Sequence, residues 1–257
     1  MEGIYQHFRP EEKDFIDKVI AWKSEVEMMY APKLTDFLDP RQQFLTKSIV
    51  GSGDINVQFF GGNPTAERKR ALLYPSYYSP EEQDFDIVLF ELKYPTKFVQ
   101  LDHRQVLGTL LSLGIKREKF GDIIVNNGRI QFLVVAELAS FIEMHLQKVG
   151  KASVKVERLP LSDIMNHAEE WQEKQTTVSS LRLDVVLSGI TNLSRQKVQS
   201  MIKNGLVKVN WQLIDEPSFI CQEGDILSVK GFGRSKLFSI DGQTKKEKWR
   251  ITMGILK

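Results

Sequence analysis

The sequence predicts an α+β protein made of three successive folded parts. Three observations lead to this prediction: helical and strand patterns alternate over residues 84–159, a helix-helix-strand pattern occupies residues 182–210, and two helical patterns precede residue 51. The chain has 257 residues, of which 42% are hydrophobic and 26% are charged, so it can bury real cores. The expected parts are residues 1–78, 79–161 and 181–257, with a linker helix at 162–180.

The first part is expected to contain helices and a strand. Apolar residues recur at helical spacing within residues 11–29, and Asp39-Pro40 is a start signal for a second helix. Residues 56–60 fit a short strand, and residues 66–73 are expected to form a basic helix. The cations of that helix are secondary candidates for contacts with an anionic ligand: Arg68, Lys69 and Arg70.

The second part has the element order β-α-β-β-α-β, the split βαβ or ferredoxin-like arrangement that RRM domains share. The expected elements are a strand from residue 85, a helix at 103–113, strands at 122–125 and 130–135, a helix at 136–149 and a strand at 153–159. The usual RRM aromatic run is absent, since Phe132 is the only aromatic residue of the third strand. A basic loop adds three secondary candidates for phosphate contacts: Lys116, Arg117 and Lys119.

The third part contains an unusual helix start. Ser194 is a natural N-cap, which places Arg195 at the first helical position and Lys197 at the third. The helix dipole favours acids over bases at these positions, so the placement is unfavourable unless an anion binds there. Free backbone N–H groups flanked by Arg and Lys suit a phosphate, and nucleic acid is the polyanion that carries many phosphates.

The residues around this helix are predicted to sort into a core face and a polar face. Val198, Met201 and Ile202 share one side of the helix, and Val207 and Val209 alternate with polar residues in the strand that follows. Residues 236–240 and 248–255 are expected to pair as a hairpin. The candidate RNA-binding residues are Arg182, Ser194, Arg195, Lys197, Lys203, Lys208, Asn210, Arg234 and Lys236.

These spacings resemble a known RNA-binding module. Arg182-Leu183-Asp184, Ser194-Arg195 with Lys197, the residues from Ile202 to Asn210, and Gly224-Asp225 are similar to the alpha-L motif of small-subunit ribosomal protein four. With Gly231 to Arg234 and two further domains ahead, the whole chain looks like the YlmH family of bacterial RNA-binding proteins. That resemblance implies ribosomal RNA or tRNA as the ligand, rescue of stalled large ribosomal subunits, and a link to cell division.

Charge and composition point to the same class of protein. Residues 182–257 carry 13 Lys and Arg against 7 Asp and Glu, although the whole chain has a formal net charge of only +2. The positive end therefore coincides with the predicted module. The single Cys221 excludes an intrachain disulfide and is expected in the core, and the start of the chain has no signal-peptide pattern. We expect a cytoplasmic protein without a membrane span.

Catalytic signals are weak. Arg182-Leu183-Asp184 is similar to the tripeptide around the catalytic aspartate of pseudouridine synthases, but here it falls within the first helix of the module, where Asp184 can pair with a neighbouring base. The four histidines have no metal-ligand spacing, and no phosphate-binding loop occurs. We expect no catalytic residue, metal, cofactor or small-molecule substrate. An RNA-modifying enzyme and an adaptor for the division machinery are the alternatives.

Overall fold

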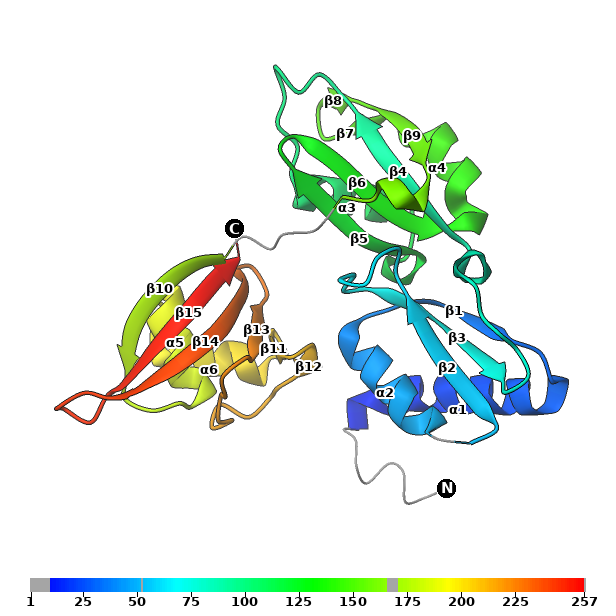
Figure 1. Cartoon of the computed structure of the whole chain (residues 1–257). Coiled ribbons are helices and arrows are strands. Elements are labelled where there is room, and N and C mark those ends of the chain that lie inside the picture. The colour runs from blue at the N-terminus through cyan, green and yellow to red at the C-terminus, as the bar shows by residue number, and fades with distance from the viewer. Residues whose placement is uncertain (1–9, 52, 166–170, 257) are drawn as a thin grey trace. The chain divides into compact units, whose positions relative to one another are not determined.

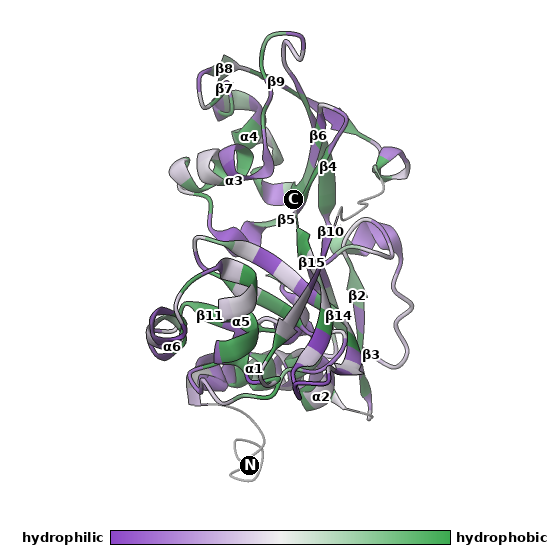
Figure 2. Ribbon diagram, turned by 90° about the vertical axis from the view of Figure 1, so that its left-hand side faces the viewer, coloured by the Kyte–Doolittle hydropathy of each residue, from purple (hydrophilic) through white to green (hydrophobic). Residues whose placement is uncertain are grey.

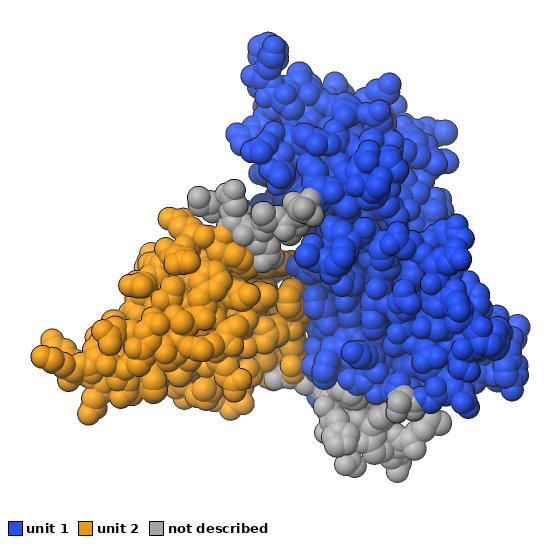
Figure 3. All heavy atoms as spheres, viewed as in Figure 1, with its two compact units in different colours: residues 1–167 blue, residues 168–257 orange. Residues whose placement is uncertain are grey.

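The computed structural model describes residues 10–51, 53–165 and 171–256. It has mixed α and β structure with several antiparallel sheets. The chain divides into two compact units, residues 1–167 and residues 168–257 (Figure 3). Among the described residues, no helix is both long enough and apolar enough to cross a membrane.

The first part of the chain forms a three-stranded antiparallel sheet with two helices. Its elements are α1 (Lys13–Met29), β1 (Lys33–Leu38), α2 (Pro40–Val50), β2 (Ile55–Phe60) and β3 (Lys69–Pro75), and the strand order is β1-β3-β2 (Figure 1). The predicted start of α2 is confirmed: the Asp39 carboxylate accepts from the Gln42 backbone N–H, and the Gln42 side chain returns the bond. Strand β1 was not expected from the sequence.

The helix expected at residues 66–73 is wrong. Residues 69–75 form β3, the central strand of the sheet, which pairs with β1 on one side and β2 on the other. Arg, Ala and Leu favour a helix in isolation, and a strand buried on both faces lacks the alternation that would have revealed it. Pairing with two neighbours therefore overrides the local preference.

The second part of the chain follows the predicted order of elements. They are β4 (Ile87–Lys93), α3 (His103–Ser112), β5 (Phe120–Asn126), β6 (Arg129–Val135), α4 (Ala139–His145) and β9 (Lys155–Leu159), with the short hairpin of β7 (Lys148–Val149) and β8 (Ala152–Ser153) before the last strand. The sheet order is β5-β6-β4-β9, and all neighbours are antiparallel. One sheet face packs against the helices through buried side chains such as Phe90, Phe132 and Leu110.

The opposite face of this sheet is covered by other segments of the same unit. Phe37 of β1 is fully buried against Leu89 and Leu133. Gly121 allows this approach, because a Cβ at that position would lie 2.8 Å from the Phe37 ring. Further along the face, the Gln131 side chain accepts from the Met165 backbone N–H at 2.7 Å. This sheet face is therefore occupied by protein.

The third part forms a six-stranded antiparallel sheet with two helices. Its elements are β10 (Trp171–Val178), α5 (Leu183–Thr191), α6 (Arg195–Lys203), β11 (Val207–Val209), β12 (Gln212–Leu213), β13 (Ile226–Val229), β14 (Gly233–Gln243) and β15 (Trp249–Leu256). The order is β10-β15-β14-β13-β11-β12. Figure 2 shows α5 mostly hydrophobic and α6 mostly hydrophilic. Both helices pack on one sheet face, where Val207, Leu237 and Met253 are buried.

The linker helix expected at residues 162–180 is wrong for residues 171–178. These residues form β10, which pairs along its whole length with β15. Residues 161–163 form a single 3₁₀ turn, and residues 166–170 lie outside the described residues. The β-branched Thr176, Thr177 and Val178 favour a strand, and Val178 is buried in the core of the third part. The C-terminal unit therefore begins before residue 171.

Candidate nucleic-acid interface

The start of α6 has the predicted geometry. The Ser194 hydroxyl oxygen accepts from the Lys197 backbone N–H at 3.3 Å, and the first turn contains no acidic residue. Val198, Met201 and Ile202 are buried, whereas the side chains of Arg195, Lys197 and Lys203 are exposed. Arg195 and Lys197 therefore stand in the first turn, where the helix dipole opposes a cation, and an external anion would relieve this cost.

Asp184 organises the basic residues beside this helix start. Its carboxylate has no exposed surface and accepts hydrogen bonds from Arg182 (3.1 Å), Arg195 Nε (2.8 Å) and Gln199 (2.6 Å). Burial alone would raise the pKa of Asp184, but these hydrogen bonds outweigh it and lower the pKa to about 2. The aspartate is thus ionised at neutral pH and anchors two arginines.

The two arginines remain accessible although they are anchored. The Arg182 and Arg195 side chains are 36% and 52% exposed, and Arg195 reaches Asp184 through its Nε. An arginine held at one edge loses less side-chain entropy when its other N–H groups bind a phosphate. The hydrogen bond from Gln199 to Asp184 is not predictable from the sequence, because it depends on the packing of α6 against α5.

Three other sequence candidates lie on a different surface. Lys208 pairs with Ser228 across the sheet, and Ser228 pairs with Arg234, so these side chains share one sheet face. Lys236 lies two residues further along β14 on that same face. Since Val207 and Val209 point toward the helices, Lys208 points to the face that the helices leave uncovered. The predicted set is therefore divided between two sides of the sheet.

Asn210 takes part in the fold rather than in either cationic surface. The side-chain Nδ2 of Asn210 donates to Asp225 at 2.8 Å, and the side-chain Oδ1 accepts from the Ile226 backbone N–H at 2.9 Å. Its φ of 48° lies in the left-handed region that asparagine tolerates in turns. Asn210 is exposed, and its contact with RNA stays a prediction.

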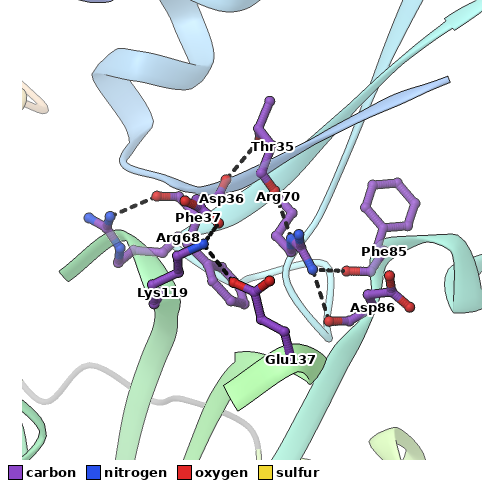
Figure 4. A network of polar contacts seen from close by, with 9 residues as sticks. All are labelled: Thr35, Asp36, Phe37, Arg68, Arg70, Phe85, Asp86, Lys119 and Glu137. Carbon is purple, nitrogen blue, oxygen red and sulfur yellow. Dashed lines mark hydrogen bonds and ion pairs between the residues drawn. The ribbon is translucent and has the colours of Figure 1, made fainter. Parts of the chain in front are cut away.

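Arg68 and Arg70 are buried inside the first unit and do not form a surface patch. Arg68 donates to the Phe37 carbonyl oxygen at 2.9 Å, and Arg70 donates to Thr35, Phe85 and Asp86 carbonyl oxygens (Figure 4). Burial lowers the pKa of each guanidinium, while nearby carboxylates oppose the effect. These arginines hold backbone segments together, which corrects their assignment as RNA contacts.

The basic loop before β5 is also largely engaged within the unit. Lys119 bridges Asp36 at 2.9 Å and Glu137 at 2.7 Å, as Figure 4 shows, and thereby links β1 to the turn before α4. Arg117 donates to the Phe120 carbonyl oxygen at 2.7 Å and lies over the Phe120 ring. Lys69 donates to the Pro64 carbonyl oxygen. Of these loop cations, Lys116 is the exposed one.

Other chemical candidates are weaker. No cluster of three or more His, Cys, Asp or Glu in the described ranges could hold a metal ion. Cys221 is buried, as predicted, and its burial raises the thiol pKa to about 12. A shallow groove along α3 is lined by Arg104, Gln105, Gly108, Thr109, Ser112, Lys148 and Gly150.

The chain is 49% identical over 252 residues to "Ribosome-associated protein quality control protein P2" of Bacillus subtilis (strain 168), and the match covers 98% of each protein. The chain belongs to the YlmH family. Family models match residues 11–78 ("YlmH, N-terminal"), 80–163 ("Putative RNA-binding domain in YlmH") and 181–227 ("S4 domain"). The solved structure "Cell division protein ylmH from Streptococcus pneumoniae" covers 63% of this chain and 99% of its own, with 34% identity and a TM-score of 0.57.

Proposed function

We propose that this YlmH-family protein binds ribosomal RNA, or tRNA, on the ribosome without catalysing a reaction, and acts in the quality control of stalled large subunits in the cytoplasm. The observation that carries the proposal is the start of α6 in the S4 domain. There, exposed Arg195 and Lys197 stand where the helix dipole favours an anion. The name of the Bacillus subtilis relative supports the ribosomal setting.

The proposed contact residues on the helix side are Arg182, Ser194, Arg195, Lys197 and Lys203. Asp184 sets the positions of the two arginines, while the two lysines supply unanchored charge. Contacts of this kind bind the phosphate backbone and fix the orientation of the protein, and they carry little sequence information. The ligand of this surface is therefore expected to be a structured RNA element that is recognised by shape.

A further proposal concerns the fold of the middle domain, for which we retain a start at residue 79. We infer a ferredoxin-like fold from its element order and from its strand order β5-β6-β4-β9. The face used by RRM domains is covered by Phe37 and its neighbours, so any RNA contact of this domain would involve another surface.

A paired charge-reversal experiment tests the proposed function. Lys197→Glu with Lys203→Glu should weaken binding of the full chain to a ribosomal RNA fragment and reduce the slope of log affinity against log salt by about one or two. Lys245→Glu with Lys246→Glu makes the same change of charge at the exposed end of the β14–β15 hairpin and should have a smaller effect. Equal losses for both variants would mean that only net charge matters and would overturn the assignment.

Two other functions remain to be separated from RNA binding. The name of the Streptococcus pneumoniae relative favours an adaptor for cell division. Partners that stay bound to the protein after RNase treatment would support that alternative. The enzyme alternative requires a reactive Asp184, but this carboxylate is buried and saturated with hydrogen-bond donors. A pseudouridine made by the wild type and absent with Asp184→Asn would establish the enzyme.

A further inference from the structure

The uncovered face of the C-terminal sheet carries aromatic and cationic side chains in one row. Arg234 Cζ lies 5.8 Å from the centre of the Trp211 ring, and Lys236 Nζ lies 6.0 Å from the centre of the Phe238 ring. The Phe238 ring meets Trp171 edge to face, with ring centres 6.1 Å apart. Because Arg234 and Lys236 are two residues apart on β14, the two cation–aromatic pairs are adjacent. We call Trp211, Arg234, Lys236, Phe238 and Trp171 the aromatic row.

The rings of this row do not belong to the hydrophobic core. The core lies on the other sheet face, where β14 contributes Leu237 and β11 contributes Val207 and Val209. Trp211, Phe238 and Trp171 are each partly exposed and are not among the side chains packed against that core. Large aromatic side chains that are partly exposed to solvent and alternate with cations are typical of binding surfaces and contribute little to a hydrophobic core.

The backbone at Trp211 strengthens this interpretation. Asn210 and Trp211 form the two-residue connection between β11 and β12, with φ of 48° and 63°. A two-residue hairpin turn with both φ positive favours Asn-Gly, because a side chain at the second position is strained. Here tryptophan, a bulky residue, occupies the position that suits glycine. Neither the turn nor the core requires this ring, and strain of this kind often marks a functional position.

We propose that the aromatic row binds unpaired nucleotides of RNA. Bases stack on Trp211 and Phe238, and Arg234, Lys236 and the neighbouring Lys208 hold the phosphates between them. Stacking needs a free base face, which a duplex does not offer, so this surface selects single-stranded segments. This inference deepens the proposed RNA-binding function and rests on it.

The proposal assigns two kinds of RNA to two surfaces of one domain. The outward side of α6 offers cations without an aromatic residue, which suits the backbone of structured RNA. The aromatic row adds stacking surface to its cations, which suits looped-out or terminal nucleotides. Both surfaces belong to residues 171–256, so a hairpin with an unpaired loop can engage the stem on one side and the loop on the other.

The test compares two probes on the full chain: an oligouridine single strand and a blunt duplex with the same number of phosphates. Trp211→Gly removes the ring and supplies the residue that the turn favours, so the variant should stay folded. We expect its affinity for oligouridine to fall roughly tenfold while its affinity for the duplex is unchanged. Trp211→Phe, which keeps a stacking ring, should retain most of the oligouridine affinity.

The outcomes separate this inference from the proposed function. Unchanged oligouridine binding by Trp211→Gly would overturn the inference, and so would equal losses for both probes. The double change Lys197→Glu with Lys203→Glu should weaken binding of the duplex more than that of the single strand. If that variant loses duplex affinity while Trp211→Gly has no effect, the proposed function stands and the aromatic row has another role. A wild-type protein that binds neither probe would overturn both.

Discussion

Asp184 shows how one buried residue connects stability to the candidate interface. A buried carboxylate is costly unless its charge is compensated, and here two arginines and a glutamine provide the compensation. The same bonds fix Arg182 and Arg195 at the edge of the proposed RNA-binding surface. The local pattern Arg-x-Asp can therefore be read as a support for cationic side chains, without any catalytic step.

Asp184→Asn should lower the free energy of unfolding by about 2 kcal/mol at neutral pH, because a pKa held near 2 favours the folded, ionised state. Since the pKa of Asp184 is lowered in the folded state, the ionised carboxylate stabilises the fold fully above about pH 4. This stabilisation disappears as the pH falls toward about 2. Urea unfolding of wild type and variant across this range measures the difference. Glu173→Gln, an exposed control on β10, should show no such gap. A stability difference between wild type and Asp184→Asn that persists at the lowest pH would contradict a stabilising role of the ionised carboxylate.

Helix α6 violates a local rule of helix stability at the position where we place its function. Ser194 at the N-cap is normally complemented by Glu or Gln three residues later, but this chain has Lys197 there. Among the described α-helices, α2 and α3 have capping boxes, and both use the favourable pair of Asp and Gln. Lys197 therefore lowers the stability of this helix start. A role of its charge in binding a ligand explains why a lysine stands there.

Lys197→Glu should therefore have opposite effects on stability and on binding. The substitution completes a capping box and places an acid near the positive helix end, which should raise the free energy of unfolding by about 0.5 kcal/mol. RNA affinity should fall. Lys203→Glu in the last turn of α6 is the matched comparison, because it should lower both the free energy of unfolding and the RNA affinity. Thermal melts and RNA titrations of the two variants measure the four effects, and a destabilised Lys197→Glu would contradict this account of the helix start.

Most cations of residues 10–165 that the sequence suggests as RNA contacts serve the internal structure of that unit. Arg70 and Lys119 connect the first sheet to segments of the second part, and Arg68 binds the Phe37 carbonyl oxygen of β1. Reversing the charge of Lys119 would therefore disturb folding and would not test RNA binding. The groove along α3 offers better candidates. Arg104 and Lys148 are exposed on it, and neither has an assigned partner among the described residues of that unit.

The full chain should remain on ribosomal subunits at a salt concentration that releases the isolated module of residues 168–257. Two weak sites on linked units raise the overall affinity about a hundredfold or more when both engage. Arg104→Glu with Lys148→Glu should remove much of the difference, while the same reversal at Lys18 and Lys47, exposed on α1 and α2, should not. Cosedimentation across a salt series measures this. Release of chain and module at the same salt would favour the adaptor function.

Features that depend on local chemistry can be predicted from the amino-acid sequence. The capped start of α6, the alternating valines of β11 and the element order of the middle part follow from spacing and capping, which act over a few residues. The fixed-offset pattern around Arg182 and Ser194 likewise pointed to the family, because those positions lie within one small module.

The exposure of individual cations and of the sheet faces depends instead on tertiary packing. Arg68 and Arg70 are indistinguishable from surface residues in the sequence, and their burial depends on carbonyl groups far away along the chain. Strand β10 is not predicted from the sequence because its partner residues in β15 lie 71 to 85 positions later, from Val178–Trp249 to Trp171–Leu256. The division of the basic residues between the helix side and the aromatic row has the same cause, since side chains distant in sequence share a face only after the strands have paired.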